Sequence, residues 1–198
     1  MKDSGLVIGI TGGSGSGKTT LLNIIRQQGG LVLDCDAIYH DLLRSDTTML
    51  EAIETRFPGT VRDGALDRKK LGGIVFADEG ALLDLNAITH TAVKQEVLRC
   101  LADAPALVAI DAIGLFEGGL AELCHTTVAV TAPEEMRIVR LMNREGISRE
   151  YAQKRIAAQK SEAWFREKCD YVLENDGTLD AFATKCLAFL REIGIINA

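Results

Sequence analysis

Residues 9–20 read GITGGSGSGKTT, and five of these twelve letters are glycine. The spacing Gly12-x-x-x-x-Gly17-Lys18-Thr19 fits the phosphate-binding P-loop at every fixed position. The apolar run LVIGIT (6–11) predicts a buried strand before the loop, and KTTLLNIIRQ (18–27) predicts a helix after it. Glycines let successive backbone N–H groups turn toward an anion, and the helix start adds its positive dipole end. The stretch therefore predicts a P-loop; the alternative, a glycine-rich turn that binds nothing, is disfavoured by both spacing and context.

The P-loop assigns chemistry to individual residues. We expect Lys18 to reach the β- and γ-phosphates of a nucleoside triphosphate, which we expect to be ATP, and the Thr19 hydroxyl to bind Mg²⁺. The other phosphate-binding residues are expected along the loop and the start of its helix: Gly12, Gly13, Ser14, Gly15, Ser16, Gly17 and Thr20. The motif does not say which group receives the phosphate.

The composition narrows the class of protein. The chain has 198 residues, of which 47% are hydrophobic and 25% charged, so we expect one domain with a substantial core. A net charge of −6 disfavours a general nucleic-acid binder. The five cysteines are scattered and form no C-x-x-C pair, which indicates reduced thiols and no zinc site. Neither a secretory leader nor a membrane-length apolar run is found, so we expect a soluble, cytoplasmic protein without a membrane partner.

Strands and helices alternate along the chain. Buried strands are predicted at 6–11, 31–34, 106–111, 126–131 and 171–175, and helices at 18–28, 36–43, 134–145, 148–159, 161–169 and 179–194. Residues 47–103 have a helical pattern throughout, broken by a turn at Pro58-Gly59. The alternation predicts a three-layer α/β fold with a parallel sheet, in which 47–103 and 134–169 are helical insertions on a core of about 1–46, 104–133 and 170–198.

Three aspartates follow predicted strands. Asp34 and Asp36 end the second strand and would share a face because they are two residues apart. We take Asp36 as the carboxylate that orients an acceptor hydroxyl and receives its proton; the alternative is that Asp36 only caps the helix AIYHDLL. Asp111 closes the strand LVAID, where it could hold Mg²⁺, or else serve as a cap or turn residue.

Arginines recur with helical spacing beyond residue 134. A stripe of them could close over the γ-phosphate and exclude water, or could be a solvated face paired with acids such as Glu134 and Glu145. The stripe is formed by Arg137, Arg140 and Arg144, at i, i+3 and i+7; Arg149 and Arg155 follow in the next predicted helix.

The three histidines carry a weaker signal. His40 and His125 are interpreted as structural, and His90 lies within a predicted helix without a partner pattern.

The ordered set of motifs resembles the dephospho-CoA kinases over nearly the whole chain. The resemblance rests on GITGGSGSGKTT, VLDCDAIYHDLL, LDRKKLGGIVFAD, LNAITH, IDAIGLFEGGL, RLMNREGISREYAQKRIAAQ and DYVLENDG. It implies a P-loop kinase of the nucleoside-monophosphate-kinase type that uses ATP and Mg²⁺ to phosphorylate the 3′-hydroxyl of dephospho-CoA, the last step of coenzyme A synthesis. The helical block 47–103 would then bind the acceptor, and 134–169 would form a lid.

The resemblance also implies roles for individual residues. Asp36 matches the family's catalytic acid, and the helices carrying Arg140, Arg144 and Arg155 match its lid. Catalytic roles are thereby predicted for Lys18, Asp36, Arg140 and Arg144, and nucleotide contacts for Arg144, Asn175 and Gly177, the last two near the adenine. The residues predicted to bind the acceptor are Asp36, Arg68, Phe76, His90, Asp111 and Glu117.

The chain departs from the family pattern in two places. Thr91 stands where proline is usual after the histidine, and Ile113-Gly114-Leu115 follows Ala112 where the family usually has Pro-Leu-Leu after the strand-end aspartate. Both departures lie on the acceptor side. Two alternatives therefore stay open: another small-molecule or nucleoside kinase of the same fold, or a nucleotide-binding regulator without turnover. We expect a small-molecule substrate, no nucleic-acid partner and a monomer.

Overall fold

The centre of the molecule is a parallel five-stranded sheet. The computed structural model describes residues 5–196. Within them the strand order is β2-β5-β1-β6-β7. The strands are β1 (Leu6–Thr11), β2 (Leu31–Asp34), β5 (Leu107–Asp111), β6 (Thr126–Thr131) and β7 (Tyr171–Glu174). These five strands lie where the sequence predicts them. All pairings within the sheet are parallel, so the carboxyl ends of the strands meet at one edge.

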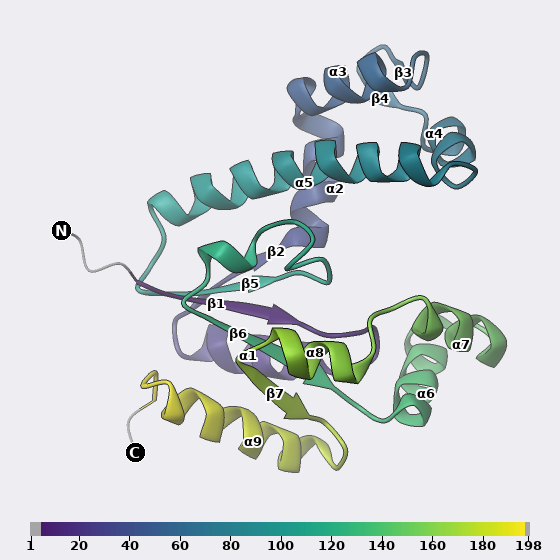
Figure 1. Cartoon of the computed structure of the whole chain (residues 1–198). Coiled ribbons are helices and arrows are strands. Elements are labelled where there is room, and N and C mark those ends of the chain that lie inside the picture. The colour runs from purple at the N-terminus through teal and green to yellow at the C-terminus, as the bar shows by residue number, and fades with distance from the viewer. Residues whose placement is uncertain (1–4, 197–198) are drawn as a thin grey trace.

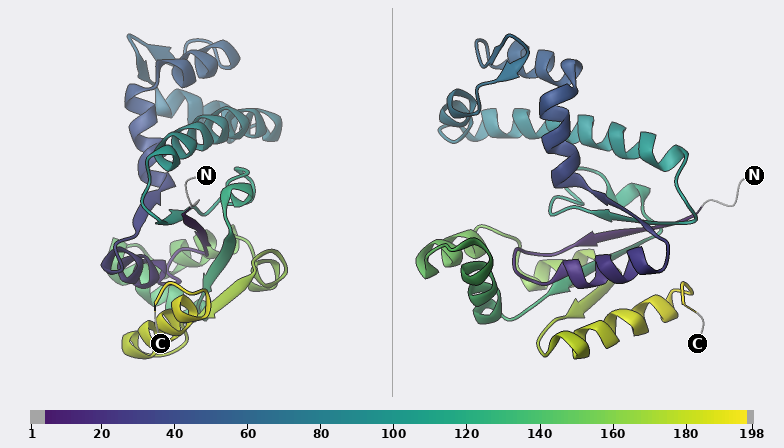
Figure 2. Two further views of the ribbon diagram at one scale, coloured as in Figure 1. Left: turned by 90° about the vertical axis from the view of Figure 1, so that its left-hand side faces the viewer. Right: turned by 180° about the vertical axis from the view of Figure 1, so that it is seen from behind.

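Helices cover both faces of the sheet (Figures 1 and 2). Along β1, Ile8 and Ile10 pack toward α1 (Lys18–Gln27) and α9 (Leu179–Glu192), whereas Val7 belongs to the core on the opposite face. That opposite face is covered by α8 (Glu162–Lys168) and by the segment 112–125, which includes the short helix η1 (Ala121–Leu123). The three-layer α/β fold expected from the sequence is confirmed.

A helical region rises from the β2 side of the sheet. It contains α2 (Cys35–Ser45), α3 (Thr47–Arg56), α4 (Arg68–Val75) and the long α5 (Glu79–Ala102). Buried residues of these helices join those of β2 and β5 in one continuous core. The region is therefore fixed to the sheet through α2 at one end and through α5 at the other, as Figure 2 shows.

The expectation of no strand in 47–103 is wrong. β3 (Val61–Arg62) and β4 (Ala65–Leu66) form an antiparallel hairpin. Between them, Asp63 and Gly64 adopt positive φ angles of 51° and 74°. Asp-Gly is the favoured pair for a two-residue hairpin turn, so the signal was present. The strands were missed because two residues are too short to display an alternating pattern.

Two helices project from the opposite side of the sheet. α6 (Glu134–Glu145) and α7 (Arg149–Ala157) pack on each other through a small core of their own, formed by Ile138, Leu141, Ala152 and Ile156. α6 ends at Gly146, whose φ of 66° favours glycine. In Figure 1 this pair faces the helical region across the carboxyl edge of the sheet.

Two further observations bear on the class of protein. None of the helices in the described part of the chain is long and apolar enough to cross a membrane. All five cysteines, which lie in the described part of the chain, are free thiols.

Candidate active site

The candidate site lies where the carboxyl ends of β1, β5 and β2 meet the start of α1. β5 lies between β1 and β2, so Asp111 is the register partner of Asp34 on one side and of Ile10 on the other. Ligands of open α/β sheets bind at this edge. The P-loop, Asp111 and the residues that follow β2 are thereby brought together.

The P-loop backbone forms an anion cradle. Gly12, Gly15 and Gly17 have φ angles of 135°, 78° and 100°, which side chains rarely tolerate. A Cβ on Gly12 would lie 2.2 Å from the Val130 carbonyl oxygen, so the loop also needs glycine for its close approach to β6. Among the hydrogen bonds of residues 5–196, none uses the N–H of Gly15, Gly17, Lys18 or Thr19 as donor. Those donors remain for the oxygens of a phosphate.

Lys18 lies in the cavity that the P-loop encloses, of about 270 Å³. Its ammonium donates a hydrogen bond to the Gly12 carbonyl oxygen at 2.9 Å. Burial lowers the pKa of Lys18, while the carboxylates of Asp111 and Asp36 oppose that change. A half-buried ammonium at the P-loop is suited to accept the negative charge of a phosphate chain.

Asp111 is the most strongly perturbed carboxyl of the site. Its pKa is raised to about 6: burial is the largest cause, the Lys18 ammonium opposes the shift, and the nearby charges of Asp34 and Asp36 add to it. Asp111 and Thr19 line the same cavity, and Thr19 is exposed at the start of α1. No cluster of three or more metal-ligating side chains is found in the described residues. Two oxygen donors beside a phosphate site nevertheless fit Mg²⁺, which usually takes one or two protein ligands plus phosphates and water.

The structure corrects the assignment of the two aspartates after β2. The strand ends at Asp34, and Asp36 lies in the first turn of α2, so the two do not share a strand face. Asp34 caps α2 by accepting a hydrogen bond from the Ala37 N–H at 3.0 Å. The capping role considered for Asp36 therefore belongs to Asp34. Asp36 is exposed, and no hydrogen bond to its carboxylate occurs within the described chain.

The arginines of α6 divide into two groups. Arg137 donates to the Ser14 carbonyl oxygen at 3.0 Å, and Arg140 donates to the carbonyl oxygens of Gly15 and Ser16, both at 3.2 Å. For these two, the solvated-face interpretation is wrong.

The remaining arginines are more exposed. Arg144 and Arg155 both pair with Glu145 at 2.5 Å, yet both also line the P-loop cavity. Arg149 pairs with Glu135 and lies outside that cavity.

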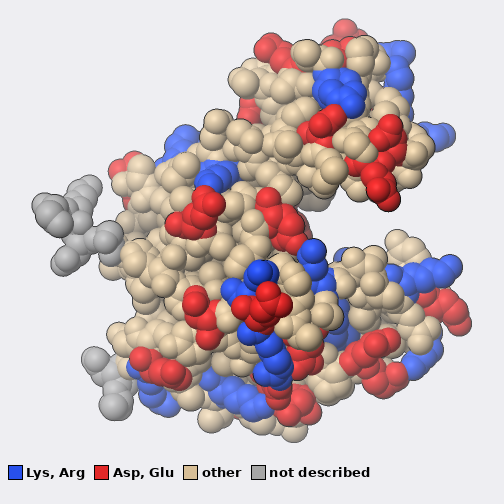
Figure 3. Space-filling view, viewed as in Figure 1, with Lys and Arg blue, Asp and Glu red and all other residues tan. Residues whose placement is uncertain are grey.

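A groove leads from the P-loop cavity into the helical region. A second cavity of about 250 Å³ shares Asp36 and Ile113 with the P-loop cavity. A third, of about 180 Å³, shares Tyr39 and Leu85 with the second. We call these two cavities together the acceptor-side groove; Figure 3 shows the surface hollowed between the helical region and the α6–α7 pair. Asp36 stands where the groove meets the P-loop cavity.

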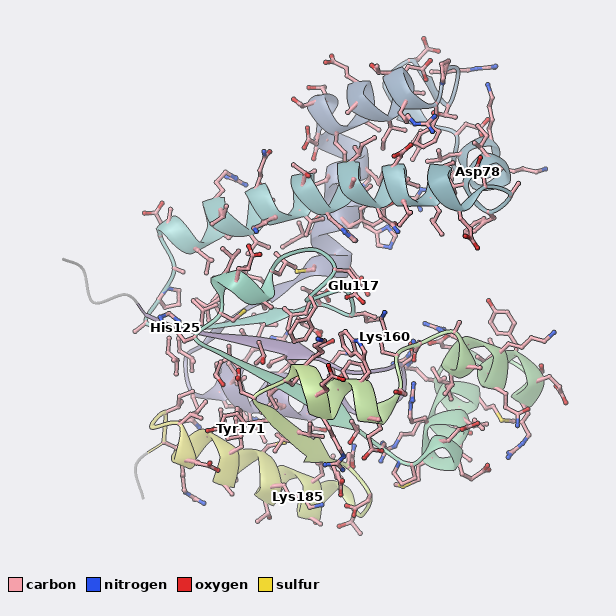
Figure 4. All side chains as sticks on the ribbon, in the orientation of Figure 1. Asp78, Glu117, His125, Lys160, Tyr171 and Lys185 are labelled. Carbon is pink, nitrogen blue, oxygen red and sulfur yellow. The ribbon has the colours of Figure 1, made fainter. Side chains whose placement is uncertain are left out.

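Besides Asp36, three of the predicted acceptor residues line this groove. His90 lies in the second cavity, and Arg68 and Phe76 lie in the third, where Phe76 is 84% exposed. Glu117 is in neither cavity; its carboxylate is 3.4 Å from the Lys160 ammonium, and Figure 4 shows the two side by side at the edge of the sheet.

The two departures from the family pattern meet near His90. A Cβ on Gly114 would be 4.0 Å from His90 Nε2, so the 113–118 segment passes close to the imidazole. The Thr91 hydroxyl donates to the Ala87 carbonyl oxygen, and α5 continues through this position as a regular helix.

Asn175 and Gly177, predicted near the adenine, are not brought together at one surface. Asn175 is 5% exposed; its amide donates to the Ser16 carbonyl oxygen at 2.8 Å and accepts from Arg140 at 3.2 Å. It therefore supports the P-loop from behind. Gly177 lies two residues further on, beside Ala181 and outside the cavities described above.

The other histidines are accounted for. His125 accepts a hydrogen bond from the Val7 N–H at 3.0 Å through Nδ1, which agrees with a structural role. His40 is exposed and lines the third cavity beside Tyr39, so its interpretation as merely structural is incomplete.

Two residues near the site, Tyr39 and Gln159, were not predicted from the sequence. Tyr39 follows Asp36 by three residues on α2 and therefore shares its face, a spacing that could have been noticed. Gln159 hydrogen-bonds to Ser14, and nothing in its local sequence indicates a contact over 145 residues.

Comparison with known proteins is consistent with this geometry. The family model described as dephospho-CoA kinase matches residues 6–181. A dephospho-CoA kinase from Latilactobacillus sakei is 36% identical over 191 residues, covering 94% of this chain and 95% of the relative. A solved structure called TT1252 from Thermus thermophilus is 36% identical with a TM-score of 0.80, covering 96% of this chain and 99% of that one. The structure of a dephospho-CoA kinase from Campylobacter jejuni is 25% identical with a TM-score of 0.66, covering 94% and 96%.

Proposed function

The chain belongs to the dephospho-CoA kinase family and is a kinase. We propose that it transfers the γ-phosphate of ATP to the 3′-hydroxyl of dephospho-CoA, with Asp36 as the general base. In the proposed reaction the 3′-hydroxyl oxygen of dephospho-CoA bonds to the γ-phosphorus of ATP. The bond from that phosphorus to the β–γ bridging oxygen breaks, ADP leaves, and the hydroxyl proton passes to the Asp36 carboxylate. ATP as donor and dephospho-CoA as acceptor follow from the family; the geometry supports the roles that we propose for individual residues.

The observation that carries the proposal is the position of Asp36. Its carboxylate makes no cap, and it lies at the junction between the P-loop cavity and the acceptor-side groove. A base must reach the hydroxyl while the γ-phosphate is in line on its other side, so it belongs at such a junction.

The remaining residues stabilise charge and hold the reactants. Lys18 and the free N–H groups of the loop would bind the β- and γ-phosphates. Thr19 and Asp111 would hold Mg²⁺, which neutralises phosphate charge when bound. Arg144 and Arg155 can leave Glu145 for phosphate oxygens, because exposed ion pairs are weak.

The regional division follows the same logic. We propose that the helical region, which consists of α2 and residues 47–103, binds the acceptor, since Arg68, Phe76 and His90 line the groove there. Residues 134–169 would act as the lid that excludes water from the phosphates. The net charge of −6 supports a small-molecule partner and not nucleic acid. We further propose that the enzyme works as a monomer in the cytoplasm.

The test is Asp36→Asn, with Asp34→Asn as the matched control. Asparagine is nearly isosteric with aspartate and caps helices about as well, so both variants should fold and bind ATP. Loss of a general base predicts a fall in kcat of roughly 10²–10⁴-fold for Asp36→Asn only. The measurements are ADP release with dephospho-CoA, a melting curve and an ATP titration. A kcat within about threefold of wild type would remove Asp36 from the mechanism.

The same assay separates the alternatives. ADP release with a nucleoside but not with dephospho-CoA would indicate a different small-molecule kinase. Tight ATP binding without product from any acceptor would indicate a nucleotide-binding regulator.

A further inference from the structure

Every polar group of Ser14 is held by two residues from the α6–α8 segment. The Ser14 N–H donates to Gln159 Oε1 at 3.0 Å, and the Ser14 hydroxyl accepts from Gln159 Nε2 at 2.8 Å. The Ser14 carbonyl oxygen accepts from Arg137 Nε at 3.0 Å. Arg137 and Gln159 are themselves joined by a hydrogen bond of 2.5 Å. We call Arg137 and Gln159 the loop clamp.

The clamp approaches the P-loop as closely as the backbone permits. A Cβ on Gly13 would lie 2.2 Å from an Arg137 nitrogen and 2.8 Å from Gln159 Oε1. Glycine at 13 is thus required by the clamp, since its φ is not in the left-handed region. Ser14 is only 7% exposed, so its polar groups depend on these protein partners more than on water.

The clamp divides the loop into two parts. The N–H of Ser14 donates to Gln159, whereas the N–H groups of Gly15, Gly17, Lys18 and Thr19 have no partner in residues 5–196. Hydrogen bonds to all three polar atoms of Ser14 restrain the backbone that leads into α1. The direction of the free donors therefore depends on a glutamine that itself does not line the P-loop cavity.

We propose that Gln159, acting with Arg137, is a positioning residue that holds the P-loop in its phosphate-binding conformation. The two come from separate parts of the proposed lid: Arg137 from α6, and Gln159 from just after α7. The same contacts hold the base of the lid against the loop. The inference rests on the proposed function only for its kinetic test, because the clamp's effect on ATP affinity is measurable without an acceptor.

Gln159→Met tests the proposal, with Gln153→Met as its matched control. Methionine has nearly the shape of glutamine but none of its hydrogen bonds, and Gln153 is exposed on the same lid. Removing buried hydrogen-bond partners of a loop that must present its donors predicts a loss of about ten- to hundredfold in kcat/KM for ATP. The KM for dephospho-CoA should stay within twofold of wild type, and Gln153→Met should match wild type in both constants.

A second variant changes Arg137, the other residue of the clamp. Arg137→Lys keeps the positive charge, but an ammonium cannot reproduce the planar contacts to both Ser14 and Gln159. It should show the same selective loss, and the double variant should lose little more than either single one, because the clamp acts as a unit. This variant also serves if Gln159→Met does not fold.

Three results would overturn the inference. These are wild-type ATP kinetics in both Gln159→Met and Arg137→Lys, a parallel rise in KM for both substrates that follows a fall in melting temperature, and fully additive losses in the double variant. An ATP titration without acceptor keeps this test separate from the proposed function. A wild-type enzyme that binds ATP but does not phosphorylate dephospho-CoA would contradict only the acceptor, whereas unchanged ATP affinity in Gln159→Met would contradict the clamp.

Discussion

Replacing Asp111 with asparagine should make the ligand-free protein more stable while impairing it as an enzyme. Burial raises the pKa of Asp111 to about 6 from an ordinary value of 3.8. At 1.36 kcal/mol per pKa unit, keeping this carboxyl ionised in the folded protein costs about 3 kcal/mol at neutral pH. The asparagine removes that cost. The pKa of about 6 already includes the attraction of the Lys18 ammonium, so we expect a gain of up to about 3 kcal/mol in the free energy of unfolding.

The stability gained by Asp111→Asn should depend on pH, in a direction set by the raised pKa of Asp111. Because the folded-state pKa lies above the unfolded one, the stability contributed by the protonated carboxyl is fully present below pH 3.8 and is lost as the pH rises through about 6. The advantage of Asp111→Asn should therefore be nearly complete at pH 7.5 and about half as large at pH 5. Urea unfolding with EDTA and without nucleotide, at both pH values, measures the difference between the two proteins.

The enzyme assay completes the experiment. If Asp111 holds Mg²⁺, the variant should need more Mg²⁺ for half-maximal turnover and should lose at least about tenfold in kcat. A variant less stable than wild type at pH 7.5, or a stability gain that does not shrink at pH 5, would refute the electrostatic reasoning.

Four further substitutions have distinct expected outcomes. Lys18→Ala should keep the fold and lose most turnover, measured by ADP release, because its side chain serves the phosphate cavity; wild-type turnover would contradict this. Arg144→Ala should lower kcat with an unchanged melting temperature, whereas Arg140→Ala should lower both, because only Arg140 is bonded to the P-loop backbone. Equal melting temperatures in the two variants would be the contrary result. Phe76→Ala should raise the KM for dephospho-CoA and not for ATP, with the similarly exposed Leu83→Ala as control; an unchanged KM would exclude Phe76 from acceptor binding.

Much of the fold could be predicted because its signals are local. The P-loop lies in one stretch, and its strand and helix show their periods directly beside it. The order of the strands is not local: nothing in the sequence states that β5 inserts between β1 and β2. That insertion makes Asp111 a neighbour of Asp34 and accounts for part of its raised pKa.

The exchange of roles between Asp34 and Asp36 has a similar cause. The pattern LVLDCD is compatible with a strand that ends at either aspartate, and strand ends are poorly defined by sequence alone. A difference of two residues decides which carboxylate caps α2 and which stays free. The sequence therefore predicts that this pair of aspartates belongs to the site. The structure was needed to show which of the two caps α2.

The site is built from groups that oppose the stability of the ligand-free fold. Burial disfavours the charged forms of both Lys18 and Asp111. The positive φ angles at positions 12, 15 and 17 require glycine, which leaves the loop without side chains that would restrict its backbone. A phosphate chain with its cation would supply the charges that these groups lack. The hydrogen bonds of Arg137, Gln159, Arg140 and Asn175 to the loop offset part of that cost before any ligand binds. Support from these residues would favour phosphate transfer, because donors held in place before binding need no reorganisation at transfer.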